Sequence, residues 1–123
     1  MELYKLNGKL YPCSTSVTMA YIGGKWKTVI LWYLAISPLR YGELRKKLTV
    51  VTERTLSLQL KQLEEDGIIN RKVYTKKPPM KVEYSLTQFG ESLIPLLKML
   101  SDWGDEVVKD KGVVVNFDPT TDS

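Results

Sequence analysis

The sequence contains no histidine and only one cysteine, and these shortages exclude several kinds of site. Structural and catalytic zinc sites are built mainly from Cys and His side chains, so the usual zinc sets cannot form. Catalytic arrangements that need a histidine base, such as Ser-His-Asp or Cys-His, are excluded for the same reason. Paired carboxylates could only come from residues such as Glu64, Glu65 and Asp66, whose position indicates a solvated helix end. We therefore expect no enzymatic activity, no metal and no cofactor.

Long hydrophobic runs are missing as well. No apolar run approaches the ~20 residues that a membrane-spanning helix requires, and the first residues lack the apolar core of a signal peptide. A lone thiol cannot form a disulfide within one chain. These features predict a cytoplasmic protein that does not enter the membrane. With 123 residues, 43% of them hydrophobic and 26% charged, the chain is expected to form one globular domain with its own core.

The net charge is +4, but the cationic residues are unevenly distributed along the chain. Between residues 40 and 81 there are eleven Lys or Arg against five Asp or Glu, whereas the remainder has seven against nine. A basic surplus confined to one segment is typical of a protein that binds a polyanion such as nucleic acid. An anionic membrane is the other polyanion to consider, but the segment lacks the bulky apolar face that membrane binding requires.

The basic segment contains two helical periods, which together span residues 41–67. In the first, Leu44 and Leu48 share one face and cations occupy the other. In the second, the apolar stripe consists of Leu56, Leu60 and Leu63. The opposite face carries hydroxyls, an amide and cations, which can bond to base edges and phosphates. The alternative is an ordinary helix pair with a solvated polar face, and this segment alone does not separate the two.

Two helices are predicted before this segment. The first spans about residues 15–22, with Ser14 or Thr15 as its N-cap, and ends at a pair of glycines. The second spans about residues 25–35 and ends at a Ser-Pro pair, after which a short strand is expected at 39–41. Residues 1–12 are interpreted as a loosely held N-terminal arm.

Alternating apolar residues after the helix pair predict a β-hairpin, with strands at about 68–74 and 82–86 and a lysine-rich tip. A long final helix should begin at an N-cap formed by Thr87, continue to about residue 109, and bend at Pro95. Its apolar residues cover more than one face, so it needs a second partner beyond its own domain.

The order of these elements is that of a winged helix-turn-helix. The predicted fold class is α+β and mostly α, with an N-terminal helix and a long C-terminal helix for dimerisation. The leucine-spaced helix pair, the basic hairpin and the localised charge indicate this plan together, although each is a weak signal alone. The expected domain spans residues 13–110, after the arm at 1–12 and before a C-terminal tail at 111–123.

Several runs of the sequence resemble one family closely. They are IGGKWKTVILWYL, RYGELRKKL, LSLQLKQLEEDGII and PPMKVEYSLTQFGESLIPLL, followed by DWG. These runs resemble the HxlR family of bacterial winged-helix transcription regulators, which are related to MarR-type proteins. The likeness covers about residues 13–108 and is most specific at GGKWK and VEYSLTQFG. It departs from the common pattern at Pro12, which precedes rather than follows the cysteine, and at Leu58, where a polar residue is frequent.

The resemblance implies that the second helix of the pair enters the major groove of a double-stranded DNA operator and that the wing follows the flanking backbone. The residues that it would place against base edges are Thr52, Glu53, Arg54, Thr55, Ser57 and Lys61. The residues that it would place against the DNA backbone are Arg40, Arg45, Lys72, Lys76, Lys77 and Lys81.

The resemblance also implies a homodimer, which agrees with the excess of apolar residues on the final helix. The expected interface residues are Val17, Tyr21, Leu96, Leu97, Leu100, Trp103 and Val107. A dimeric repressor that binds a palindromic operator is the favoured function. The alternative is a winged-helix module that contacts another protein without binding specific DNA.

Cys13 lies where several members of the family carry a reactive thiol that senses oxidants, quinones or aldehydes. A thiol beside a helix N-terminus is exposed to the positive end of the helix dipole, which lowers the thiol pKa and increases the thiolate fraction. The resemblance therefore implies a possible partner at Cys13, a small electrophile or oxidant. The alternative is a buried, inert thiol that packs like a small hydrophobic residue.

Overall fold

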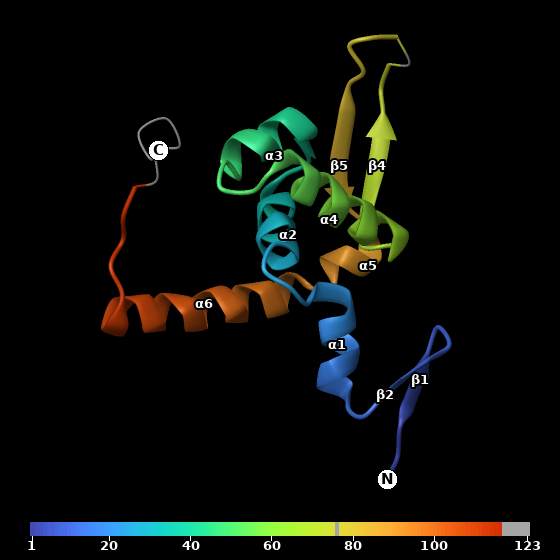
Figure 1. Ribbon diagram of the computed structural model, residues 1–123, viewed down its shortest axis with the longest axis vertical. Coiled ribbons are helices and arrows are strands. Elements are labelled where there is room, and N and C mark those ends of the chain that lie inside the picture. Colours follow the sequence, from blue (N-terminus) through green and yellow to red (C-terminus); the bar gives the residue numbers. More distant parts are fainter. Residues whose placement is uncertain (76, 117–123) are drawn as a thin grey trace.

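A computed structural model describes residues 1–75 and 77–116 of the chain, and Figure 1 shows its elements. A short hairpin and four helices precede the wing, and two helices follow it. In chain order the elements are β1 (Tyr4–Leu6), β2 (Lys9–Tyr11), α1 (Ser14–Ile22), α2 (Lys27–Ile36), β3 (Leu39–Arg40), α3 (Tyr41–Lys47), α4 (Glu53–Glu65), β4 (Ile69–Val73), β5 (Val82–Leu86), α5 (Gln88–Glu91) and α6 (Ile94–Lys111).

The core is one cluster of buried side chains between α2, α3, α4 and the three-stranded sheet. The predicted leucine stripes of α3 and α4 supply much of it, since Leu44, Leu56 and Leu63 are fully buried. Burial of one such side chain contributes roughly 1.5–3 kcal/mol, so the stripes dock this helix pair firmly on the rest of the domain. The exposed faces of α3 and α4 are thereby held in fixed positions.

The three-stranded sheet has the order β3-β5-β4, with both pairings antiparallel. Leu39 and Arg71 lie on either side of Tyr84 in register, and Arg40 and Lys72 lie on either side of Glu83. The predicted hairpin and the short strand before the helix pair are both confirmed. Because β3 is only two residues long, the far end of β5 has no third strand beside it among the described residues and projects with β4 as a wing (Figure 1).

The N-terminal arm is ordered as a hairpin, β1–β2, so the prediction of a loosely held arm was wrong. Asn7 and Gly8 form the turn with φ angles of 50° and 79°, and Tyr4 pairs with Tyr11 across the ladder. Two consecutive positive φ values are typical of the tight turns that match the twist of paired strands, and Asn-Gly adopts them readily. The hairpin packs against α1.

The final helix is interrupted, whereas the sequence predicted one continuous helix with a bend at Pro95. Thr87 caps the short α5 as expected, since its hydroxyl accepts a hydrogen bond from the Gly90 N–H at 2.9 Å. The chain then leaves the helix near Ser92, and α6 begins at Ile94. Pro95 lies in the first turn of α6, where its missing N–H leaves no helical hydrogen bond unmade. The bend is therefore a helix boundary.

Thr87 also joins the base of the wing to α5. Its hydroxyl lies 3.0 Å from the carbonyl oxygen of Ile68, and its backbone N–H donates to the same carbonyl at 3.0 Å. Gly90 packs directly on this carbonyl, because a Cβ at Gly90 would lie 2.1 Å from the Ile68 oxygen. The wing, the end of α4 and the start of α5 thus meet at one tightly packed junction.

Helix α6 extends away from the domain (Figure 1), and its apolar side chains lie on more than one side of the helix. Leu97 is buried in the core, whereas Trp103, three-quarters exposed, and Leu100 and Val107 lie on a second side that no element of the described chain covers. Among the described residues, no helix combines the length and apolar character needed to cross a membrane.

Candidate nucleic-acid interface

The start of α4 is fixed by two threonines that bond to each other. Thr52 is the N-cap, and its hydroxyl accepts a hydrogen bond from the Thr55 backbone N–H at 3.1 Å. The two hydroxyls also lie 3.0 Å apart. This pairing satisfies one of the helix's free N–H groups. Both threonines were predicted to read bases, and in the structure their hydroxyls bond to each other at the cap.

The exposed side of α4 contains most of the other predicted base-reading residues. Arg54, Ser57 and Lys61 are exposed, and Glu53 stands beside them at the first helical position. Leu58 is half exposed on the same helix, so it is free to contact another molecule and is not tucked against a neighbour. The surface therefore offers cationic, hydroxyl, carboxylate and apolar groups within about two and a half turns of helix.

Arg45 is placed differently from its prediction as a contact to the DNA backbone. Its guanidinium donates hydrogen bonds to the carbonyl oxygens of Leu48 and Val51 in the turn between α3 and α4. Its Nε lies 3.9 Å from a carboxylate oxygen of Glu53. We therefore reassign Arg45 as a brace that closes the helix-turn-helix and holds the start of α4.

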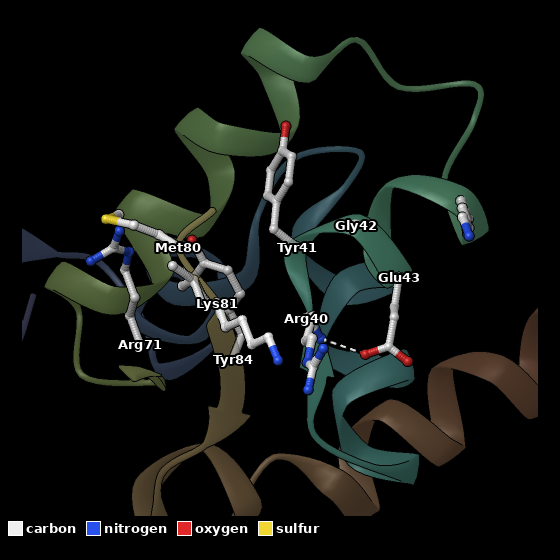
Figure 2. A pocket seen from close by; sticks show the side chains of 10 residues that line it. Arg40, Tyr41, Gly42, Glu43, Arg71, Met80, Lys81 and Tyr84 are labelled. Atoms are coloured by element: carbon white, nitrogen blue, oxygen red, sulfur yellow. Dashed lines mark hydrogen bonds between the residues drawn. The ribbon is translucent and has the colours of Figure 1, made fainter. Parts of the chain in front are cut away.

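A groove of about 600 Å³ lies between the start of α3 and the base of the wing (Figure 2). Arg71, Lys81 and Tyr84 line it from the sheet, whereas Arg40 and Tyr41 line it from the start of α3 (Figure 2). Lys46 contributes a fourth cationic side chain. Sequence reasoning identified Arg40 and Lys81, but it missed Tyr41, Lys46 and Arg71 because strand and helix patterns do not show which distant residues face one groove.

The groove and the exposed side of α4 adjoin each other through Tyr41. The Ser57 hydroxyl lies 3.4 Å from the Tyr41 hydroxyl, although the two residues are sixteen positions apart. Figure 2 shows the Tyr41 ring rising from the start of α3 toward α4. The residues predicted to read bases and those that line the cationic groove therefore belong to one continuous surface.

The wing also carries a small charged cluster. The Tyr74 hydroxyl donates a hydrogen bond to Glu83 at 3.0 Å, and the Lys72 ammonium lies 4.8 Å from the centre of the Tyr74 ring. This hydrogen bond to the Glu83 carboxylate raises the pKa of the Tyr74 phenol, because it stabilises the protonated form. Lys77 is exposed near the tip, and the predicted contact Lys76 lies outside the described residues.

Cys13 is exposed and is itself the N-cap of α1, so the predicted caps Ser14 and Thr15 were wrong by one or two residues. Ser16 completes the cap, because its hydroxyl accepts from the Cys13 N–H at 3.4 Å and donates to the Cys13 carbonyl at 2.7 Å. The pKa of the Cys13 thiol is lowered, first by the backbone N–H of Ser16 and then by the Ser16 hydroxyl. In the single chain the thiol is therefore exposed and not buried.

The residues predicted for a dimer interface lie on α1 and α6, but they differ in exposure. Leu97, predicted as an interface residue, is buried in the core of the single chain. Tyr21 is half-buried, and its ring packs edge-on against Phe89 with 5.4 Å between centroids. An apolar groove of about 610 Å³ lies beside these residues, lined by Met19 and Ile22 from α1 and by Leu96 and Leu100 from α6.

Comparison with known proteins identifies the family of the chain. A family model described as the HxlR-like helix-turn-helix matches residues 21–112. The chain belongs to the HxlR family. The matched range runs from the last residues of α1 to the end of α6, and the hairpin β1–β2 lies outside it. The HxlR fold accounts for the winged helix-turn-helix seen here, in which α3 and α4 form the helix-turn-helix and β4 and β5 form the wing.

Relatives of this HxlR chain are transcription regulators rather than enzymes. YdeP of Bacillus subtilis (strain 168), an HTH-type transcriptional regulator, is 47% identical over 94 residues, which cover 76% of this chain and 73% of YdeP. The redox regulator HypR in its reduced form is 40% identical with a TM-score of 0.74, over 80% of this chain and 95% of HypR. A MarR-family transcriptional regulator from Porphyromonas gingivalis W83 is 34% identical with a TM-score of 0.72, over 77% and 92% of the two chains. The chain is therefore a DNA-binding transcription regulator of the HxlR and MarR type.

Proposed function

We propose that the protein binds a specific palindromic operator as a homodimer and represses transcription from it. The observation that carries this proposal is the continuity of the α4 surface with the cationic groove, through the contact between Ser57 and Tyr41. Side chains on α4 would meet base edges in the major groove, and cations of the groove and wing would meet the phosphates. A protein bound in this way over a promoter excludes the polymerase without a further contact. The proposal places it in the cytoplasm, with the DNA.

The dimer is proposed to form through α1 and α6. The exposed apolar side of α6, together with the groove beside α1, leaves a large apolar surface that a second copy would cover. A two-fold axis between two such protomers would place the two α4 helices in major grooves about one helical turn apart, ~34 Å. The operator would then be an inverted repeat.

Binding to mixed and selected duplexes tests this function. If the dimer contacts on the order of 6–10 phosphates, affinity should fall by ~10³–10⁵-fold between 50 and 200 mM salt. A duplex selected by the protein from a random library should retain a large advantage over random DNA at every salt concentration. The alternative, a winged-helix module that docks on another protein, predicts little salt-dependent affinity for any duplex.

A second proposed function is thiol-based sensing at Cys13, which is favoured by its exposure and lowered pKa. In this scheme a thiolate adds to an electrophile such as a quinone. Alternatively, two thiols of the dimer lose two electrons and two protons to diamide, which becomes the hydrazine as a disulfide forms. Either change would release the operator. Release by diamide or quinone that persists in Cys13→Ser contradicts this scheme and leaves the DNA-binding proposal unaffected.

A further inference from the structure

The groove between α3 and the wing has the chemical character of an anion site. Four cationic side chains from different elements line it: Arg40 from β3, Lys46 from α3, Arg71 from β4, and Lys81 beside β5. All four side chains are exposed and line the same groove, so together they make its surface strongly positive. Arginines add planar donor groups that match phosphate oxygens in pairs.

The one acidic residue that lines the groove, within the described part of the chain, already has a partner there. A Glu43 carboxylate oxygen accepts a hydrogen bond from the Arg40 backbone N–H at 2.9 Å, which closes a capping box at the start of α3 (Figure 2). This bond directs the carboxylate toward the backbone. Tyr84, only 8% exposed, supplies a rigid wall. The cationic groups of the groove are therefore available to hold an anion from outside.

The neighbour of the groove indicates which anion it takes. Tyr41 lines the groove, and its hydroxyl lies 3.4 Å from the Ser57 hydroxyl on the exposed side of α4. An anion seated here thus lies directly beside the helix that would read bases. In duplex DNA the anion beside a base edge in the major groove is a phosphodiester of the same site, and contacts to phosphate fix the register of a protein along the duplex.

We propose that this groove seats a single phosphodiester of the operator and so fixes the register of α4 along the DNA, with Arg71 as the main clamp. The inference rests on the proposed DNA-binding function and adds a defined position for one phosphate. Arg71 is exposed at the centre of β4, paired with Tyr84 across the ladder, which holds its backbone rigidly. Tyr41 is a positioning residue, because it lines the groove that would hold the phosphate and also contacts Ser57, which would face a base pair.

A methylphosphonate scan tests the seat. The probe is the duplex selected from a random library, in which each phosphate in turn is replaced by a neutral methylphosphonate. For the wild-type protein, one position in each half-site should weaken binding by about 10-fold or more, as expected for loss of a charge-assisted contact. For Arg71→Ala, neutralising the same phosphate should weaken binding by less than about two-fold, because the side chain that contacts it has already been removed. Replacement at the other phosphates should weaken binding as much as it does for the wild type.

Three control variants make the result specific. Arg71→Lys should recover much of the sensitivity at the seat, because it restores the charge. Lys98→Ala removes a cation from α6, where Lys98 pairs with Asp102 at 3.2 Å, and should leave the whole scan unchanged. Tyr41→Phe, which removes only the hydroxyl, should keep the seat but widen the bases accepted beneath Ser57. If Arg71→Ala fails to fold by circular dichroism, Lys81→Ala carries the same test.

The outcomes separate the seat from the function on which it rests. If wild type binds the duplex in a salt-dependent manner and Arg71→Ala, or its substitute, has the same profile as wild type, the seat is wrong and DNA binding stands. If wild type binds no duplex in a salt-dependent manner, both proposals fall. Selective loss of sensitivity at one phosphate per half-site supports the seat.

Discussion

The guanidinium of Arg45 donates a hydrogen bond to the carbonyl of Val51, six residues later, and so closes the turn between α3 and α4. The same nitrogen donates to the Leu48 carbonyl at 3.2 Å. Both acceptors belong to residues with buried side chains, so the brace connects the path of the turn to the core. The position of α4 relative to the groove depends on this connection.

Replacing Arg45 by alanine should therefore destabilise the fold. Hydrogen bonds with a charged donor contribute about 1.5–3 kcal/mol, and because the side chain is 30% exposed we expect a loss of about 1–2 kcal/mol in the free energy of unfolding. Urea unfolding measures it. Lys46→Ala is the matched control, since it removes an exposed neighbouring cation and should change stability by less than ~0.5 kcal/mol. Equal midpoints for the two variants would show that Arg45 does not brace the turn.

Two glycines should respond to alanine in opposite directions. A Cβ at Gly90 would lie 2.1 Å from the Ile68 carbonyl oxygen, so Gly90→Ala must displace backbone and should cost at least ~2 kcal/mol. At Gly104, inside α6, an added Cβ would have no described atom within 4 Å apart from the adjacent residues and the backbone of its own helix. Gly104→Ala should therefore stabilise the protein by ~0.5–1 kcal/mol through helix propensity. Chemical denaturation of both variants at one protein concentration measures the difference, and a stable Gly90→Ala would mean that the junction adjusts freely.

Arg54 and Lys77 should differ in how they affect specificity. Arg54 lies on the exposed side of α4, so Arg54→Ala should weaken operator binding by ~1–3 kcal/mol and barely alter binding to random DNA. Lys77 lies near the tip of the wing, and Lys77→Ala should weaken both alike and reduce the salt slope by ~1 for each phosphate that it no longer neutralises. Fluorescence anisotropy with the two duplexes measures both effects. Equal losses on operator and random DNA for Arg54→Ala would refute its base-reading role.

A charge at Trp103 should separate the proposed dimer. The side chain is 74% exposed in the single chain, and its burial against a second copy would make it a central contact of the kind that dominates interfaces. Trp103→Lys should raise the dimer dissociation constant by ~10-fold or more, which sedimentation velocity detects. Lys98→Ala changes the same helix away from this side and should leave assembly intact. A dimer that survives Trp103→Lys would locate the interface elsewhere.

The thiol of Cys13 should react at a lower pH than an ordinary cysteine. Only the thiolate is alkylated, so a lowered pKa moves the half-maximum of the rate–pH profile downward. The same thiol in the urea-unfolded chain supplies the reference. Ser16→Ala should move the half-maximum only part of the way back, because it removes the hydroxyl and retains the backbone N–H that lowers the pKa most. Superimposable folded and unfolded profiles would rule out activation of the thiol by the cap.

The sequence predicted those parts of the fold that rest on periodicity. Leucines four residues apart bury one side of a helix wherever it packs, so α3 and α4 followed directly from Leu44, Leu56 and Leu60. The N-terminal hairpin was missed although Asn7-Gly8 is a strong turn signal, because strands of three residues leave almost no alternation to read. Pro95 was predicted to bend a continuous helix because the sequence did not show that a new helix starts at Ile94. In that new helix Pro95 falls in the first turn, where it is tolerated.

Charge alone predicted the candidate interface incompletely. Arg45 and Arg54 are both cations on the polar sides of predicted helices, yet one braces a turn and the other is exposed. Arg45 differs from Arg54 because the turn places backbone carbonyls within its reach. The spacing of residues in the sequence does not predict where those carbonyls lie. Arg71 was missed for a related reason. Its role depends on the end of β3 at Arg40, which leaves the edge of β5 open and creates the groove.

The junction of Thr87, Ile68 and Gly90 has a consequence for how a dimer could be switched. The wing and α5 are connected rigidly at this junction. The Ile68 carbonyl accepts a hydrogen bond from Thr87, and it lies so close to Gly90 that a Cβ there would overlap it. Helix α6 begins three residues after α5 ends, and Leu97 anchors it in the core. In a dimer, a change in the angle between the two α6 helices would therefore rotate each domain and move its wing with it. A small rotation near Cys13 or Trp103 would then produce a larger change in the distance between the two wings. That distance has to match the spacing of the two half-sites in a palindromic operator.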